Sequence, residues 1–422
     1  MMSKSANPTN ELPKYWKWVK LEEVCEKVEA VKRKEKNPED ELLYLDIGGI
    51  DNSANKILSH KNYKWKDAPS RAQQIVLKDD ILFSTVRTYM KNIAVIENNI
   101  YDGQIASSGF CVIRNNKKAT NPKFVFYYTI SQNFLRPLNE LQTGSSYPAV
   151  RDKDVFIQPF PLPPLPTQLA IVSKIEELFS ELDKGIENLR TAQQQLKTYR
   201  QSVLKWAFEG KLTNDNIKKG ELPKGWKNVV LGDVCKNVEY GSATKSKEQG
   251  KVPVLRMGNI QNGRFEWDDL VYTDDDEEIK KYLLKKDDVL FNRTNSAEWV
   301  GKTAIYKGER PAIFAGYLIR INRIESLLDA NYITYYLNSL EAKKYGNSVR
   351  SFGVNQSNIN GTKLKSYPIC LPPLKEQHNI IQEIESRLSV ADKMEESITQ
   401  SLQQAEALRQ SILKKAFEGR LV

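Results

Sequence analysis

Apolar residues recur every three or four positions in two long stretches of the chain. The first stretch follows Leu165-Pro166 and the second follows Leu374. This alternating spacing is typical of the apolar seam of a coiled coil. The seam positions are, in the first stretch, Ile171, Ile175, Leu178, Leu182, Leu189, Leu196, Tyr199 and Val203, and in the second Ile380, Ile384, Ile398, Leu408 and Ile412. We therefore predict two long helices that end near Gly210 and Gly419.

A single helix of about 40 residues cannot bury an apolar stripe on its own, and the chain supplies one natural partner for each helix. We expect the two helices to pair with one another as an antiparallel coiled coil, because each leads away from the segment that precedes it. The seam residues then form a spacer, and the same helices offer a surface to partner subunits.

The segments before the two helices have a different pattern. Short apolar runs with frequent turn residues predict strands, and residues 122–132 and 330–344 have helical spacing. These features predict a mixed α/β (α+β) fold for both globular parts.

The chain consists of one unit of about 210 residues used twice. Arg200–Leu212 returns as Arg409–Leu421 with ten of thirteen residues identical, and Leu12-Pro13-Lys14 returns as Leu222-Pro223-Lys224. Such duplication predicts an internal pseudo-two-fold repeat. The expected divisions are a flexible N-terminus (1–11), a first globular domain (12–161), a central helical spacer and linker (162–221), a second globular domain (222–370) and a C-terminal helix (371–422).

The elements that introduce and end the helices carry a family resemblance. Leu162-Pro163-Pro164-Leu165 and Leu371-Pro372-Pro373-Leu374 are each followed three residues later by a glutamine, Gln168 or Gln377. Both helices end in Phe-Glu-Gly-Lys/Arg-Leu. With two globular domains alternating with two helices, the chain closely resembles the specificity subunit of type I restriction–modification systems.

This resemblance implies a non-catalytic subunit that recognises double-stranded DNA. Each globular part is then a target recognition domain that reads one half of a bipartite sequence in the major groove, and the helices set the half-site spacing. The implied partners are two modification (methyltransferase) subunits and, in the full complex, restriction/translocase subunits. S-adenosylmethionine, ATP and Mg²⁺ belong to those partner chains, so no cofactor is expected in this one.

Charge and rare residues agree with this interpretation. The formal net charge is +10, and residues 12–161 and 222–370 each have 23 basic and 18 acidic residues, so that each carries +5. Two histidines and four scattered cysteines provide no ligand set for zinc and no Ser–His–Asp triad. The dispersed cysteines and the lack of an 18-residue apolar run predict a cytoplasmic protein without a membrane segment.

Motifs for catalysis are also missing. Gly301-Lys302-Thr303 ends like a phosphate-binding loop, but Ser296 occupies the place of its first glycine. Asp79-Asp80 and Asp287-Asp288 are paired carboxylates of the kind that hold Mg²⁺. The favoured alternative is that they are acidic turn residues before a buried strand. We therefore expect no catalytic residue and no metal site.

Candidate DNA contacts in the first domain lie in three polar segments rich in groups that bind bases or phosphates. One follows the apolar strand that ends at Phe83, one precedes the first proline block, and one interleaves lysines with aromatic residues. The candidates are Lys64, Lys66, Thr85, Arg87, Thr88, Tyr89, Lys91, Ser146, Tyr147 and Arg151. The alternative is that these segments are ordinary polar turns, with lysines on a solvated face.

The second domain has candidates at the corresponding places, with different residue types. They are Arg293, Thr294, Asn295, Ser296, Lys302, Arg350, Asn355 and Gln356. Different residues at equivalent places are what two readers of different half-sites require. A rival function is a coiled-coil scaffold whose duplicated domains bind proteins, but that function leaves the basic domains unexplained.

Overall fold

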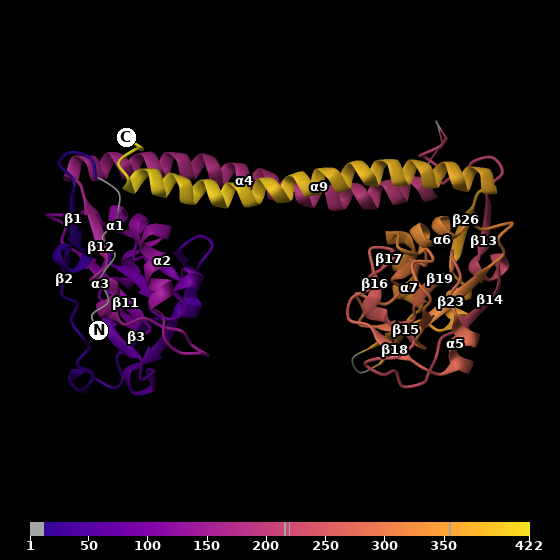
Figure 1. The fold of residues 1–422 in the computed structure, drawn as a ribbon, viewed down its shortest axis with the longest axis horizontal. Helices are drawn as coiled ribbons and strands as arrows, with labels where there is room; N and C mark the ends of the chain where they lie inside the picture. Colours follow the sequence, from indigo (N-terminus) through magenta and orange to yellow (C-terminus); the bar gives the residue numbers. More distant parts are fainter. Residues whose placement is uncertain (1–11, 215–216, 219, 354–355) are drawn as a thin grey trace. The chain divides into compact units, whose positions relative to one another are not determined.

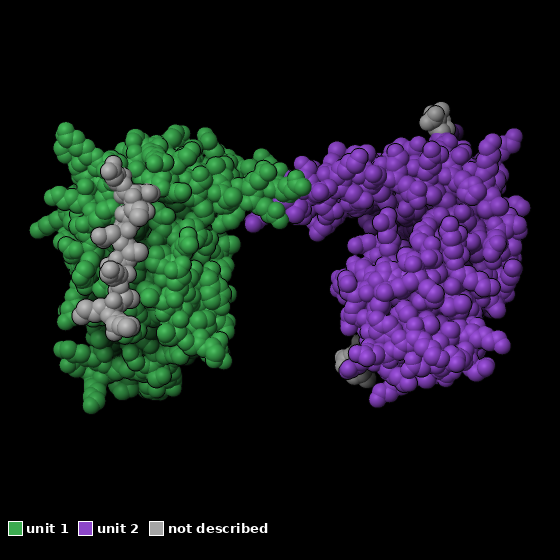
Figure 2. All heavy atoms as spheres, in the orientation of Figure 1, with its two compact units in different colours: residues 1–189, 400–422 green, residues 190–399 purple. Residues whose placement is uncertain are grey.

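The computed structural model describes residues 12–214, 217–218, 220–353 and 356–422, so the expected flexible N-terminus, residues 1–11, lies outside it. The chain forms two compact units (Figure 2). The first unit joins the chain up to Leu189 with Gln400–Val422, and the second is Arg190–Thr399. Each unit therefore contains one globular repeat and a part of both long helices.

The two long helices are present where the apolar spacing predicts them. Helix α4 spans Leu165–Phe208 and helix α9 spans Leu374–Phe417, and each has 44 residues. Both helices are followed by a glycine with positive φ, +76° at Gly210 and +69° at Gly419. A left-handed residue of this kind ends a helix, and glycine adopts it without steric cost.

Two contacts between the helices, one in each unit, together show that the helices run antiparallel. In the first unit Asp183 of α4 pairs with Arg409 of α9. In the second, Arg200 of α4 lies 2.6 Å from Asp392 of α9. Of the seam residues, Ile171, Ile175, Val203, Ile380, Ile384 and Ile412 are buried, Leu178, Leu182, Leu189, Leu196, Tyr199 and Ile398 are half-buried, and Leu408 is exposed.

The same four-stranded antiparallel sheet occurs in both repeats. Its strand order is β2-β11-β8-β9 in the first unit and β14-β23-β19-β21 in the second. The strands are β2 (Cys25–Glu26), β8 (Ile81–Ser84), β9 (Ile93–Val95), β11 (Phe110–Asn115), β14 (Cys235–Tyr240), β19 (Val289–Asn292), β21 (Thr303–Ile305) and β23 (Leu318–Arg323). The duplication seen in the sequence is therefore a duplication of the fold, and the mixed α/β class is confirmed.

Two further sheets also correspond between the repeats. A two-stranded sheet joins the start of each globular part to the strand before its long helix, and a mixed sheet contains one parallel pair. The first kind is β1 (Lys17–Lys20) with β12 (Pro159–Leu162), and β13 (Lys227–Val230) with β26 (Pro368–Leu371). The second is β6 (Lys61–Lys64), β3 (Glu41–Leu45), β10 (Ile105–Ser107) and β7 (Ala72–Ile75), and β18 (Val271–Thr273), β15 (Val252–Leu255) and β22 (Ile313–Phe314).

Small sheets complete the strands. They are β4 (Ile50–Asp51) with β5 (Lys56–Ile57), β16 (Ile260–Gln261) with β17 (Arg264–Phe265), and β20 (Thr294–Asn295) with β25 (Ser357–Asn358) and β24 (Ser351–Phe352). The short helices α3 (Asp152–Phe156), α5 (Asp276–Tyr282) and α8 (Gly361–Lys365) lie in the connections.

The helical patterns at residues 122–132 and 330–344 each correspond to two helices rather than one. The helices are α1 (Pro122–Thr129) and α2 (Gln132–Leu141), and α6 (Ala330–Leu337) and α7 (Leu340–Val349). Two residues separate the helices of each pair, and the second of them is a serine. Ser339 Oγ accepts a hydrogen bond from the Ala342 amide at 3.3 Å, so it caps a new helix instead of continuing the old one.

The long helices pack on the globular parts through aromatic residues. In the first unit the Phe417 ring of α9 lies 5.2 Å from Phe124 and 4.9 Å from Tyr128, both on α1. In the second unit the Phe208 ring of α4 packs in the same way on Tyr332 and Tyr336 of α6. Helix α6 lies between the sheets and the long helices (Figure 1). None of the described helices is sufficiently long and apolar to span a bilayer.

Candidate nucleic-acid interface

The connection between β8 and β9 carries most of the predicted contacts of the first unit. Thr85 is buried, and its hydroxyl donates to the Gly109 carbonyl at 3.1 Å. Thr88 is also buried and donates to Asn139 Oδ1 at 2.6 Å. These two threonines thus hold the connection in place. Arg87, which lies between them, and Tyr89, which follows Thr88, are more accessible.

The second predicted loop of this unit meets the first. Val86 forms a β-bridge with Ala149. The Arg87 guanidinium donates to the Ser146 carbonyl at 3.1 Å and lies 5.1 Å from the centre of the Tyr147 ring, and Tyr147 is 71% exposed. The structure therefore brings Arg87, Ser146 and Tyr147 into one surface.

The other basic candidates of the first unit have acidic partners. Lys64 and Lys66 both bind the carboxylate of Glu39, at 2.9 and 2.8 Å. They lie on and just after β6, in a different sheet from β8, the strand before Arg87. Arg151 likewise pairs with Asp154 at 2.9 Å, and Lys91 pairs with Glu406 at 3.4 Å. A nucleic acid must displace these carboxylates to use the same cations.

In the second unit the connection between β19 and β21 holds Arg293. Its guanidinium lies 4.9 Å from the Tyr240 ring centre and donates to the Gly316 carbonyl at 3.2 Å. The Arg293 Nε is buried without a hydrogen-bond partner in the described part of the chain. The guanidinium is therefore held in place by a tyrosine ring and a backbone carbonyl.

The neighbouring candidates form a small sheet with the second predicted loop. Thr294 and Asn295 in β20 pair with Asn358 and Ser357 in β25. Thr294 is buried and accepts a hydrogen bond from Asn358 Nδ2 at 2.7 Å, while Ser296 is exposed. Again, two loops that are distant in sequence form one surface.

The remaining candidates of this unit have mixed surroundings. Lys302 Nζ lies 3.9 Å from the Trp299 ring centre and donates to Gln261 Oε1 at 2.9 Å, and burial lowers the pKa of this lysine, with a further contribution from Lys343. The Arg350 guanidinium donates to the Ala297 carbonyl at 3.0 Å. Gln356 is exposed, and Asn355 lies outside the described residues.

Comparison with known proteins identifies the chain. Residues 13–191 and residues 223–406 both match the type I restriction modification DNA specificity domain. The chain belongs to this family. It is a DNA-specificity subunit and not an enzyme.

Two relatives have sequences similar to most of this chain. The StySPI specificity subunit of Salmonella potsdam is 28% identical over 316 residues, which cover 74% of this chain and 68% of that protein. The EcoKI specificity subunit of Escherichia coli K12 is 27% identical over 317 residues, with the same coverage of 74% and 68%.

Two solved structures have similar folds. A chain from a study of complex assembly and conformational transition of the type I R-M system is 29% identical, with a TM-score of 0.82 and coverage of 97% of this chain and 99% of that one. The HsdS subunit from Thermoanaerobacter tengcongensis is 29% identical, with a TM-score of 0.63 and coverage of 98% and 99%.

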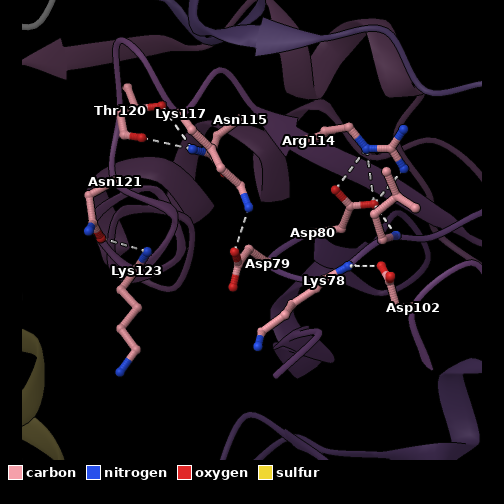
Figure 3. Close-up of polar contacts among 11 residues, drawn as sticks. Lys78, Asp79, Asp80, Asp102, Arg114, Asn115, Lys117, Thr120, Asn121 and Lys123 are labelled. Atoms are coloured by element: carbon pink, nitrogen blue, oxygen red, sulfur yellow. Dashed lines mark hydrogen bonds and ion pairs between the residues drawn. The ribbon is translucent and has the colours of Figure 1, made fainter. Parts of the chain in front are cut away.

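The acidic pair Asp79-Asp80 of the specificity subunit has structural contacts. Asp80 accepts hydrogen bonds from Arg114 at 2.7 and 3.0 Å and from the Leu77 amide at 2.8 Å, while Asp79 binds Lys117 at 2.7 Å (Figure 3). The hydrogen bonds to Asp80 raise the pKa of the Arg114 guanidinium. Across the described residues, no group of three or more His, Cys, Asp or Glu side chains is placed to hold a metal ion.

Sequence reasoning missed the aromatic partners in the second unit. Tyr240 ends strand β14, far before Arg293 in the sequence, whereas Tyr147 comes after Arg87. Comparison of the repeats therefore gave no signal for Tyr240. Trp299 had a local signal, because it stands three residues before Lys302 in a polar loop, the same aromatic and lysine combination noted near Lys64.

Proposed function

We propose that each repeat of this specificity subunit reads one half of a bipartite double-stranded DNA target in the major groove. The observation that carries this proposal is a stacked arginine in the connection after the equivalent strand of each repeat, Arg87 three residues after β8 ends and Arg293 directly after β19. Each follows the equivalent buried strand, lies over a tyrosine ring and donates to a backbone carbonyl. An arginine can donate two parallel hydrogen bonds to the O6 and N7 of guanine, so each is suited to read a base.

The distribution of charge supports DNA binding by both globular parts. Residues 12–161 and 222–370 each carry 23 basic and 18 acidic residues. An excess of +5 on each globular part favours phosphate binding and makes affinity fall with rising salt. We assign residues 12–161 and 222–370 as target recognition domains, 162–221 as the central spacer and linker, and 371–422 as the C-terminal helix.

The paired helices have two roles in this proposal. They fix the spacing between the half-sites, and they dock two modification subunits, to which restriction/translocase subunits add in the full complex. S-adenosylmethionine, ATP and Mg²⁺ act in those partner chains. We also place the subunit in the cytoplasm, since its four cysteines are free thiols, which is typical of a reducing compartment.

A paired deletion tests the spacing role. In the first unit Asp183 lies opposite Arg409, so residues 183–189 of α4 face residues 403–409 of α9. Removing both segments keeps the antiparallel register and removes the two charged partners together. Each helix loses seven residues, about 10 Å at ~1.5 Å per residue. Since one base pair rises about 3.4 Å, the preferred spacing should shorten by at most about three base pairs.

Methylome sequencing of a host that carries the subunit with its partners provides the readout. It reports both half-site sequences and the spacing between them in one experiment. We expect both half-sites to remain and the spacing to change. An unchanged spacing would rule out the spacer role, and a changed half-site sequence would show that the helices take part in base recognition.

A further inference from the structure

A short 3-10 turn in the first unit, Thr88–Met90, is bounded by two residues with left-handed backbone. Arg87 has φ of +50° and Lys91 has φ of +55°. Eight non-glycine residues in the described chain have positive φ, and five of them are Asn or Asp, which tolerate this conformation. Two of the other three flank this turn. Backbone strain of this kind is retained where the surroundings impose it, often at functional sites.

The base of the turn is held firmly. The Arg87 amide donates to the Pro148 carbonyl at 2.7 Å, and the Thr88 amide donates to Gln142 Oε1 at 3.2 Å. On the far side, Asn55 Nδ2 donates to the Lys91 carbonyl at 3.1 Å. The strained turn is therefore rigidly positioned by three separate segments.

The tip of the turn is apolar and accessible. Tyr89 is 53% exposed and Met90 is 40% exposed. The Tyr89 hydroxyl has no hydrogen-bond partner within the described residues. A held backbone that presents two exposed apolar side chains beside Arg87 is suited to contact a partner that has both stacked rings and negative charge.

The second unit repeats this feature with a different sequence. The equivalent connection, between β19 and β21, exposes Trp299, which is 45% accessible and has Lys302 Nζ 3.9 Å from its ring centre. Both repeats thus expose an aromatic ring in the connection that follows the equivalent strand. The sequences of the two connections differ, so the shared feature lies in the placement of the ring.

We propose that Tyr89, with Met90 beside it, inserts against a base step of the first half-site and stacks on a base face. The inference rests on the proposed DNA-reading function of this surface. Apolar side chains that enter a base step unstack it, and aromatic rings stack on any base. A partner that modifies a base must take that base out of the stack. The inserted side chains of Tyr89 and Met90, called the wedge below, lower the free-energy cost of that step.

Two substitutions of the same residue separate stacking from a phosphate contact. Tyr89→Phe keeps the ring and removes the hydroxyl, whereas Tyr89→Ala removes both. The variants are assembled with the modification subunits, and binding is measured on DNA in which 2-aminopurine replaces, in turn, each adenine of the first half-site. Its fluorescence rises when the base leaves the stack. Ile100→Ala, at another exposed apolar residue of the same unit, is the matched control.

Wild type, Tyr89→Phe and Ile100→Ala should bind equally and give the same fluorescence rise. Tyr89→Ala should bind about tenfold more weakly and lose the rise, with recognition of the second half-site intact. An equal loss in Tyr89→Phe would overturn the wedge in favour of a hydroxyl contact. Failure of Tyr89→Ala to bind the modification subunits would assign the tip to a protein surface instead.

Different results would reject the proposed function and the proposed wedge. If Arg87→Ala weakens binding and Tyr89→Ala does not, the wedge is rejected and the reading surface stands. If neither substitution affects the first half-site, the reading surface itself is rejected, and the wedge is rejected with it.

Discussion

Arg87 and Arg293 differ from the other basic candidates in what they contact. Their guanidinium groups bind carbonyl oxygens and tyrosine rings, whereas Arg151 binds a carboxylate. An exposed ion pair contributes little to stability, but it must be broken before the cation can bind another anion. The two stacked arginines are therefore better placed to contact DNA than Arg151.

Alanine at either stacked arginine should affect only one half-site. We expect Arg87→Ala to weaken recognition of the first half-site and Arg293→Ala that of the second, each by about 1–3 kcal/mol if the contact is to a base. Binding is measured on duplexes that carry either half-site in altered form. Arg151→Ala removes the same charge and is the control, for which a change within about 0.5 kcal/mol is expected. Equal losses at both half-sites would contradict the assignment.

Sequence reasoning could find these arginines but not their surroundings. Each follows a buried strand that the repeat comparison recognised, so its place was predictable. The stacking partners come from different parts of the two repeats, a loop for Tyr147 and a strand end for Tyr240. The sequence also does not reveal that Arg114 and Arg320 differ in register, since the strand pairing places Arg320 two residues earlier on its strand. Both still reach the equivalent aspartate, because residues two apart share a strand face.

At the scale of elements, a glutamine joins each long helix to its own globular part. Gln168 is fully buried, accepts a hydrogen bond from the Asn121 amide at 2.8 Å and donates to the Ala119 and Pro163 carbonyls at 3.0 and 2.8 Å. Gln377 repeats this arrangement in the second unit. The glutamine after each proline block therefore connects the start of the long helix, the strand before it and the cap of a short helix.

Loss of this connection should destabilise one unit. Gln168→Ala removes the partner of one buried and two partly buried backbone groups, and we expect the free energy of unfolding of the first unit to fall by about 2 kcal/mol or more. Urea unfolding followed by tyrosine and tryptophan fluorescence checks this. Gln194→Ala, an exposed glutamine of the same helix, should change it by less than about 0.5 kcal/mol. Equal effects of the two substitutions would show that the buried amide is not needed.

The aromatic ends of the helices provide a second test at this scale. Phe417 packs on Phe124 and Tyr128 in the first unit, and Phe208 packs on Tyr332 and Tyr336 in the second. Truncating such a ring costs about 3–5 kcal/mol. Phe417→Ala should expose the first unit to limited proteolysis and Phe208→Ala the second. Cleavage in the same unit for both variants would contradict this division.

The helices themselves were the most predictable elements. Their apolar spacing and the glycines after them determine where they run. The shorter helices were less predictable because apolar spacing continues through Ser131 and Ser339, where the chain starts a new helix. The side chain of Ser339 competes for a backbone amide, and a periodic pattern does not record that competition.

At the scale of the whole molecule, the duplication gives the helix pair two related surfaces. In the second unit an apolar groove of about 380 Å³ lies between α4 and α9, lined by residues that include Leu196, Tyr199, Met394 and Ile398. Met394 is half exposed there, and the repeat places Leu408, exposed in the first unit, at the position of Tyr199. An exposed apolar groove on a helix pair is suited to bind another chain.

If each related surface docks one modification subunit, the two sites should be separable. A carboxylate in an apolar interface is costly unless it is paired, so Met394→Glu should remove one modification subunit and Leu408→Glu the other. Because both side chains are exposed, folding should be unaffected. Native mass spectrometry of the purified complex should then show one modification subunit per specificity subunit for each single variant and none for the double variant. Gln404→Glu adds the same charge at an exposed position of α9 and should retain two. Two modification subunits in the double variant would exclude these surfaces as the docking sites.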